Sequence, residues 1–355
     1  MQRTFTRLLF LGTVFFSVQS YGQFAPYYTH YMLNKLAYNP ATAGEKDAIC
    51  VNALSHTQWL GQSAQDPSGF DLGNSTATNS RVNPTTQSIS ITAPILKNKN
   101  LGLGFVAVND KIGYLSTLYL RGSVAYKHGF GRKIPSDNAR GYNYDQTLSI
   151  GMDFGMVNLT QDGSKYMPID PTDPQIPNTK VSDGSFDLGA GIYYSNQSLF
   201  NGFYTGISMA HLTKPVVTAE NAFSFTTERY IHFLAGSEHD LGSISLLPSV
   251  MVRTLGGGGV QVDLSARAKM GQKLVLGAGV RSGDAIYLML GYYIKNNLYA
   301  GYSYDFNALS SSTLKYTKAG THEIFISYCF DMSFTPPIKT VKPRYNVRYL
   351  EGYSY

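Results

Sequence analysis

Three residues near the C-terminus are capable of chemistry: His322, Glu323 and Cys329, in the stretch G-T-H-E-I-F-I-S-Y-C-F. A His and a Glu can act as an acid–base pair when both reach the same substrate atom. Here the two are adjacent, and adjacent residues of a β-strand point to opposite faces. Because the stretch alternates apolar and polar residues, it favours a strand over an active site. A lipase- or protease-like activity is the minor alternative.

The other residues with catalytic or binding potential show no matching partners. His232 and His239 are seven residues apart on one expected strand and therefore on opposite faces. His56 is expected to face an interior, without an evident second metal ligand. The glycine run 256–259 precedes a strand pattern, whereas a phosphate-binding loop needs a helix after it. We therefore predict no catalytic residue, no metal and no cofactor.

The elements that must position these residues are strands. In Gly259 to Met270, G-V-Q-V-D-L-S-A-R-A-K-M, valine, leucine and alanine share one parity and the polar residues share the other. A period of two over ten residues describes a strand with one apolar and one polar face. About fourteen segments show this pattern, and each has roughly the 10 residues that a tilted strand needs to cross a bilayer. They are residues 48–59, 85–95, 101–110, 116–127, 146–158, 184–194, 202–211, 229–239, 244–254, 259–270, 273–282, 284–295, 297–308 and 321–333.

The composition favours a membrane barrel over a soluble β-sandwich. Charged residues make up 15% of the chain, against about 25% in ordinary globular proteins. The chain has 35 Gly and 27 Tyr, which suits a lipid-facing surface with aromatic rings at its margins. The mean hydropathy of −0.14 fits a barrel, whose polar inner positions dilute the average. The net charge is +6, and the basic residues are too scattered along the chain to indicate a nucleic-acid-binding surface.

The chain divides into four segments. Arg3 and Arg7 precede an apolar run that is too short for a membrane anchor, so residues 1–22 are expected to form a removed signal peptide. Residues 23–45 form an aromatic segment expected at the periplasmic mouth or within the lumen. Residues 46–333 form the barrel. Residues 334–355 form a periplasmic C-terminal tail, for which disorder is the alternative.

The lengths of the expected connections suggest an orientation. With the N-terminus in the periplasm, the outward connections 60–84, 159–183, 212–228 and 309–320 are long, and most inward ones are tight. Outer-membrane barrels have long outer loops and short periplasmic turns. Residues 128–145 are an exception, because they form a long inward connection.

The polar parity of the strands carries charges of both signs, which are expected to face the lumen. Mixed signs favour pairing across the lumen over a single-sign selectivity ring, and a solvated polar interior is an equal alternative. These residues are Arg121, Lys127, Asp153, Asp187, Asp263, Arg267, Lys269, Arg281, Asp305, Glu323 and Asp331.

The two cysteines lie at opposite ends of the barrel segment. Cys50 begins the first expected strand, and Cys329 lies late in the last. In a closed barrel these strands are antiparallel neighbours, so both cysteines fall near the periplasmic rim with the lumen-facing parity. We hypothesise a disulfide, which the periplasm permits; two isolated buried thiols are the alternative.

Several short motifs, in this order, resemble the PorP/SprF family of outer-membrane proteins of the Bacteroidota type IX secretion system and gliding motility. They are Tyr27-Tyr28-x-x-Tyr31, Asn39-Pro40-Ala41-Thr42-Ala43-Gly44, Gln58-Trp59-x-Gly61, Asp187-x-Gly189-x-Gly191-x-Tyr193, Pro248-Ser249, Leu276-Gly277-Ala278-Gly279-x-Arg281, Gly301-Tyr302-Ser303-Tyr304-Asp305-Phe306 and Gly320-Thr321-His322-Glu323-Ile324. The similarity covers nearly the whole mature chain. Residues 131–145 look like an insertion.

The resemblance implies a non-enzymatic barrel that works with the secretion machinery to export or anchor large surface proteins such as adhesins. A channel for a small solute or a hydrophobic substrate is the alternative. Besides outer-membrane lipid, the expected partners are the secretion machinery or its cargo and a periplasmic, peptidoglycan-associated component. The residues expected to bind a partner are Tyr27, Tyr28, Tyr31, Tyr38, Lys339, Lys342, Arg344 and Arg348.

Overall fold

The structure is a computed structural model. It describes residues 26–46, 48–60, 83–95, 100–135, 142–165, 179–219, 223–254, 259–271, 273–309 and 320–331.

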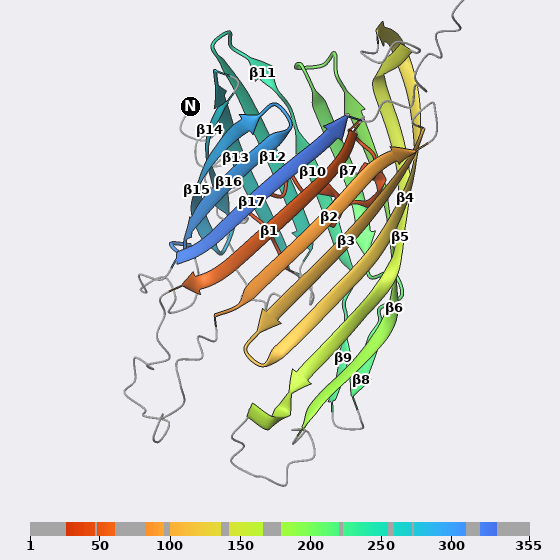
Figure 1. The fold of residues 1–355 in the computed structure, drawn as a ribbon, viewed down its shortest axis with the longest axis vertical. Coiled ribbons are helices and arrows are strands. Elements are labelled where there is room, and N and C mark those ends of the chain that lie inside the picture. Colours follow the sequence, from red (N-terminus) through yellow and green to blue (C-terminus); the bar gives the residue numbers. More distant parts are fainter. Residues whose placement is uncertain are drawn as a thin grey trace, which may run out of the picture.

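Most of the described strands belong to one antiparallel sheet that closes into a fourteen-stranded barrel (Figure 1). The strands are β1 (Ala48–Leu60), β2 (Thr85–Ile95), β3 (Leu101–Ile112), β4 (Leu115–Pro135), β5 (Tyr142–Asp162), β6 (Lys180–Asn196), β7 (Phe203–Ala210), β10 (Tyr230–Gly236), β12 (Ile244–Thr254), β13 (Val260–Met270), β14 (Leu274–Arg281), β15 (Ala285–Lys295), β16 (Leu298–Phe306) and β17 (Gly320–Asp331). The short β11 (His239–Asp240) extends the sheet beside β12. Each of these fourteen strands overlaps one of the predicted segments, so the predicted all-β barrel is confirmed.

Pairing between the first and last strands completes the sheet. In β1 and β17, Cys50 lies opposite Cys329 and His56 lies opposite Glu323. Non-adjacent β10 and β12 also pair directly, because β11 is only a short extension. We call the end of the barrel at which β1 begins and β17 ends the disulfide end, and the other end the loop end. The disulfide end is uppermost in Figure 1.

The alternation along each strand separates an apolar outer face from a polar inner face. Ile324, Ile326 and Phe330 of β17 are exposed, whereas Glu323 and Phe325 are completely buried. The same contrast runs around the barrel. Exposed apolar side chains include Ile89, Ile91, Leu103, Phe105, Ile150, Met152, Phe154, Ile286, Leu288 and Leu290. A continuous apolar exterior of this kind is what hydrocarbon requires of a spanning barrel. Among the described residues, no helix is long and apolar enough to span a membrane.

The structure corrects the expected connection at residues 128–145. Residues 128–135 and 142–145 are strand residues that lengthen β4 and β5 beyond the disulfide end of their neighbours. Gly131 has a positive φ of 85°, and the β4–β5 register shifts between Phe130 and Lys133. The extension is rich in Gly and basic residues and lacks alternation, so periodicity alone did not reveal it. In the outward connection 212–228, β8 (Val216–Ala219) pairs with β9 (Phe223–Thr226) as a separate small sheet.

Candidate functional site

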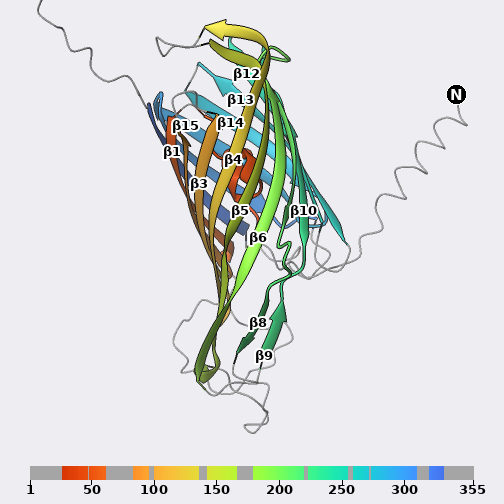
Figure 2. The ribbon, with the colours of Figure 1, turned by 90° about the vertical axis from the view of Figure 1, so that its right-hand side faces the viewer.

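Residues 26–46, which we call the plug, lie inside the barrel. Figure 2 shows their two 3₁₀ turns, η1 (Lys35–Ala37) and η2 (Pro40–Thr42), enclosed by the strands. Tyr31 and Ala43 are respectively 2% and 0% exposed. Plug side chains form a continuous hydrophobic cluster with inward residues of the wall, including Val106, Tyr287 and Phe325. Of the two places expected for the aromatic segment, the structure shows the lumen.

A buried carboxylate anchors the first part of the plug. Each oxygen of Glu323 accepts two hydrogen bonds. One accepts from the His30 main-chain N–H (2.8 Å) and from His30 Nδ1 (2.6 Å). The other accepts from the Thr29 main-chain N–H (2.9 Å) and from His56 Nδ1 (2.9 Å). Glu323, His30 and His56 are completely buried. Because a carboxylate only accepts, both Nδ1 atoms carry protons. Plug, β1 and β17 therefore meet at one acceptor.

A buried guanidinium forms a second anchor. Arg281, 1% exposed, donates to Asp263 (2.8 Å), Asp284 (3.1 Å) and Asp305 (3.0 Å). It also donates to the Thr29 hydroxyl (3.2 Å), and that hydroxyl donates to Asp305. Three carboxylates and one hydroxyl thus accept from four of the five guanidinium N–H groups. This network links β13, β14 and β16 to the plug.

Polar contacts to the plug backbone hold its second part. The Asn39 amide donates to the Ile192 carbonyl (3.0 Å) and accepts from the Ala41 N–H (2.9 Å). Arg121 donates to the Ala37 carbonyl (2.7 Å), and Lys127 donates to the Gly44 carbonyl. Two expected lumen cations thus bind plug carbonyls, in addition to the Arg121–Asp153 ion pair at 3.5 Å.

The Lys35–Glu45 ion pair closes the plug on itself, and Tyr193 donates to the same carboxylate. Burial raises the pKa of the Glu45 carboxyl, but the Lys35 ammonium and the two hydrogen bonds outweigh it, so the pKa lies below its usual value. Burial raises the pKa of the Tyr27 and Tyr38 phenols, so both stay neutral.

Glycines of the wall let the plug approach the strands. At Gly102 of β3, an added Cβ would collide with the Ala43 main chain. We expect Gly102→Ala to lower the free energy of unfolding by about 1–3 kcal/mol through overpacking. Thermal unfolding in detergent measures this. The control is Gly122→Ala on β4, where the Cβ has ordinary contacts with Phe154 at 3.5 Å. Equal unfolding midpoints for the two variants would contradict the close approach.

The structure places the expected lumen residues on the inner side of the wall. Arg121, Lys127, Asp153, Asp263, Arg281, Asp305 and Glu323 take part in the plug anchors or in the Arg121–Asp153 ion pair. Asp187 contacts His211 at 2.7 Å. Arg267 is buried and Lys269 is half-buried. Asp331 ends β17, and its side chain lies outside the described part. The expected pairing therefore exists, but much of it connects the wall to the plug and not the wall to itself.

Cys50 and Cys329 are joined in a disulfide, with Cα atoms 4.1 Å apart. The bond ties the first strand to the last at the disulfide end of the barrel.

We predict that non-reducing mass mapping of the purified protein recovers the Cys50 and Cys329 peptides joined, and that reduction separates them. Cross-linking residues so far apart in the chain restricts the unfolded state, and we expect Cys50→Ser with Cys329→Ser to cost about 2–4 kcal/mol of stability. Finding both thiols free in unreduced protein would contradict the bond.

The tyrosines expected to bind a partner have another role. Tyr27, Tyr28, Tyr31 and Tyr38 are all buried. Tyr31 contacts the Ser265 hydroxyl at 3.2 Å, and Tyr27 packs edge-on against His56. In this structure their contacts are with the interior of the barrel, and a role in binding a partner stays a prediction. Lys339, Lys342, Arg344 and Arg348 lie outside the described residues.

Two residues of the interior were not singled out from the sequence. His30 lies in a segment without periodicity, so nothing local indicated its bond to Glu323. Arg253 is buried beneath the Tyr27 ring, 4.6 Å from its centroid, and donates to Gln261. Its parity with Ser249 and Met251 on the inner face of β12 was a usable signal. Within the described ranges, no group of three His, Cys, Asp or Glu is arranged to hold a metal.

A protein-family model described as "Type IX secretion system membrane protein PorP/SprF" matches residues 20–328. No curated protein matches the chain.

Several solved structures share the barrel at low similarity. The toluene transporter TodX of Pseudomonas putida is 10% identical, with 89% of this chain and 99% of that one covered and a TM-score of 0.44. A FadL homologue of Pseudomonas aeruginosa is 12% identical, with 87% and 95% covered and a TM-score of 0.41. The CymD monoaromatic hydrocarbon channel is 11% identical, with 84% and 93% covered and a TM-score of 0.41. At these sequence identities and TM-scores, the functions of those proteins do not carry over to this chain.

Proposed function

The chain belongs to the PorP/SprF family of type IX secretion system membrane proteins, and from this premise we propose that it helps to secrete or anchor large surface proteins such as gliding adhesins. It is an outer-membrane β-barrel, as its family and its apolar exterior indicate. In this proposal it is not an enzyme. The acidic group with the most His partners, Glu323, is saturated by donors and completely buried, which supports a structural role.

The observation that carries the proposal is the filled lumen. The plug packs against inward residues all around the wall and bonds to β2, β4, β6, β12, β13, β14, β16 and β17. A large protein cannot pass through a lumen filled in this way. The barrel therefore serves as an anchor or docking platform beside the machinery that moves the cargo, and not as the conduit itself.

The disulfide end faces the periplasm in this proposal. The turn at Asn296 and Asn297 lies at this end, and short turns are typical of the periplasmic side. The lengthened β4–β5 hairpin also projects there (Figure 1). This end is the side on which secretion machinery and a peptidoglycan-associated component would meet the barrel.

Gene deletion with imaging of surface adhesins tests the proposal. We expect loss of adhesin display without loss of adhesin synthesis, and restoration by the wild-type gene. Co-purification after mild detergent extraction should then recover machinery or cargo with the barrel. Unchanged display, together with lost uptake of a small molecule, would overturn the proposal in favour of a channel.

A further inference from the structure

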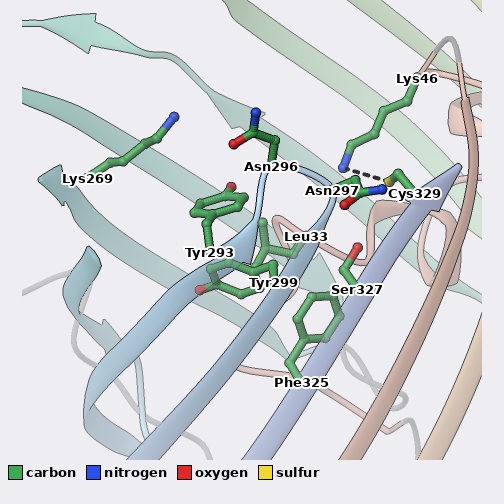
Figure 3. A pocket seen from close by; sticks show the side chains of 10 residues that line it. All are labelled: Leu33, Lys46, Lys269, Tyr293, Asn296, Asn297, Tyr299, Phe325, Ser327 and Cys329. Carbon is green, nitrogen blue, oxygen red and sulfur yellow. Dashed lines mark hydrogen bonds between the residues drawn. The ribbon is translucent and has the colours of Figure 1, made fainter. Parts of the chain in front are cut away.

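A cavity of about 530 Å³ lies at the disulfide end, between the plug and the wall (Figure 3). Leu33 and Lys46 of the plug, Lys269 of β13, and Phe325 of β17 contribute to its lining. The Asn296-Asn297 turn forms part of its rim. Its volume is within the roughly 300–1,000 Å³ range of small-ligand sites.

The cavity carries positive charge that the described residues leave unneutralised. The Lys46 ammonium lies 3.9 Å from Cys329 Sγ, and the Lys269 ammonium lies 5.4 Å from the centroid of the Tyr293 ring. Neither ammonium forms an ion pair with any described side chain. Glu45, adjacent to Lys46 in sequence, is engaged by Lys35 and Tyr193.

A third cation adds to this charge. Arg267 lies two residues before Lys269 and therefore on the same face of β13. It is 8% exposed, and its Nε has no hydrogen-bond partner within the described part of the chain. Unpaired cations this close to a partly enclosed space favour an anion there, because the lower local dielectric strengthens their attraction.

The rest of the lining is apolar and aromatic. The ring centroids of Tyr293 and Tyr299 lie 4.9 Å apart, and those of Tyr299 and Phe325 lie 6.1 Å apart. A ligand that fits both features carries a carboxylate beside an apolar side chain. Lipid headgroups fit less well, because Phe325 and Ser327 lie on the buried, inward face of β17, opposite the exposed face of Ile324.

We propose that this cavity binds an extended acidic peptide segment of a periplasmic partner, with its carboxylates at Lys46 and Lys269 and an apolar side chain against Tyr299 and Phe325. The proposal rests on the proposed function, since it names the chemistry by which the secretion partner is recognised. It makes the disulfide end a recognition surface as well as a rim.

The full-length protein in detergent is titrated with two labelled peptides, acetyl-EFELE-amide and its uncharged counterpart acetyl-QFQLQ-amide. We expect the acidic peptide to bind at least tenfold more tightly. Lys46→Gln and Lys269→Gln should each weaken it about tenfold, the effect of losing one charge-assisted contact. Lys273→Gln is the matched control, because Lys273 is exposed in the neighbouring turn and does not line the cavity.

Equal affinity for the two peptides, or unchanged binding by both lysine variants, would overturn the proposal. Binding of anionic phosphatidylglycerol vesicles that depends on both lysines, without peptide binding, would overturn it in favour of a lipid. Heat-modifiable electrophoretic mobility checks that each variant is folded. Adhesin display on cells separates the failure of the cavity proposal from the failure of the proposed function. Normal display by a strain that carries Lys46→Gln and Lys269→Gln would refute the role of the cavity and leave the proposed function standing. Normal display after deletion of the whole gene would refute the proposed function itself.

Discussion

Glu323→Ala is expected to lower the free energy of unfolding by about 3–5 kcal/mol, the cost of removing one member of a buried charged network. The carboxylate accepts from two main-chain N–H groups of the plug and from two His rings. Without it, all four donors stay buried and unpaired, and each costs about 1–3 kcal/mol where it cannot relax. Loss of the Glu323 carboxylate should therefore weaken both the pairing of β1 with β17, which closes the barrel, and the retention of the plug.

Thermal and urea unfolding in detergent micelles, followed by tryptophan fluorescence and electrophoretic mobility, measures this loss. Trp59 is the single Trp of the chain and lies at the loop end of β1, so its signal reports on closure. Glu323→Gln keeps the shape of the side chain but offers one acceptor fewer, and its stability should fall between those of wild type and the alanine variant.

Ser303→Ala is the matched control for Glu323. Ser303 is directly opposite Glu323 on β16, is completely buried, and its hydroxyl has no hydrogen-bond partner in the described part. Its removal should cost less than about 1 kcal/mol, because no bond is lost. A loss as large as that of Glu323→Ala would show that the position, and not the carboxylate, determines stability.

Arg281→Ala is expected to cost a similar amount, about 3–5 kcal/mol. The guanidinium offsets the charge of Asp263, Asp284 and Asp305 at once. Its loss leaves three carboxylates near one another with low exposure, and it also removes a donor to Thr29 of the plug. Repulsion among the carboxylates should loosen β13 to β16 and the first part of the plug.

A second substitution identifies the cause of that loss. If uncompensated carboxylate charge destabilises the Arg281 variant, adding Asp263→Asn should restore part of the stability, whereas Asp263→Asn alone should destabilise the wild type. Arg229→Ala is the control, because Arg229 is exposed and, among the described residues, its side chain makes one hydrogen bond, to the Leu212 carbonyl. An Arg281 variant with the same midpoint as the Arg229 variant would contradict the network.

The positions of the strands, and which of their residues face outward, could be predicted from the sequence, because the alternation of a strand depends only on residues that are neighbours in the chain. In β13, residues two apart share a face whatever surrounds them. Hydrocarbon outside then requires apolar residues at Leu264 and Ala266, and the interior requires polar ones at Asp263 and Arg267. The antiparallel neighbourhood of the first and last strands follows from closure, which is why the positions of Cys50 and Cys329 suggested a disulfide, with two isolated thiols as the alternative.

The ends of β4 and β5 could not be predicted in this way. Beyond about residue 127 the hairpin leaves the apolar zone, so hydrocarbon no longer selects one face and the alternation disappears. Main-chain pairing, such as that of Lys133 with Tyr144, continues the strands without any side-chain pattern. Periodicity therefore finds where a strand crosses the bilayer, and not where its hydrogen bonding stops.

By itself the sequence determined the class of protein, an exported barrel with a lipid-facing exterior. Each of these properties depends on patterns among residues that are close together in the chain. Only the tertiary structure decided what fills the lumen. His30, His56 and Glu323 are separated by long stretches of chain, and the plug has no period that shows which side chains face the wall. Their meeting at one carboxylate depends on barrel closure and on the path of the plug within it. The His322-Glu323 pair is thus divided: the ring of His322 contacts Tyr302 near the outer surface, while Glu323 holds the plug.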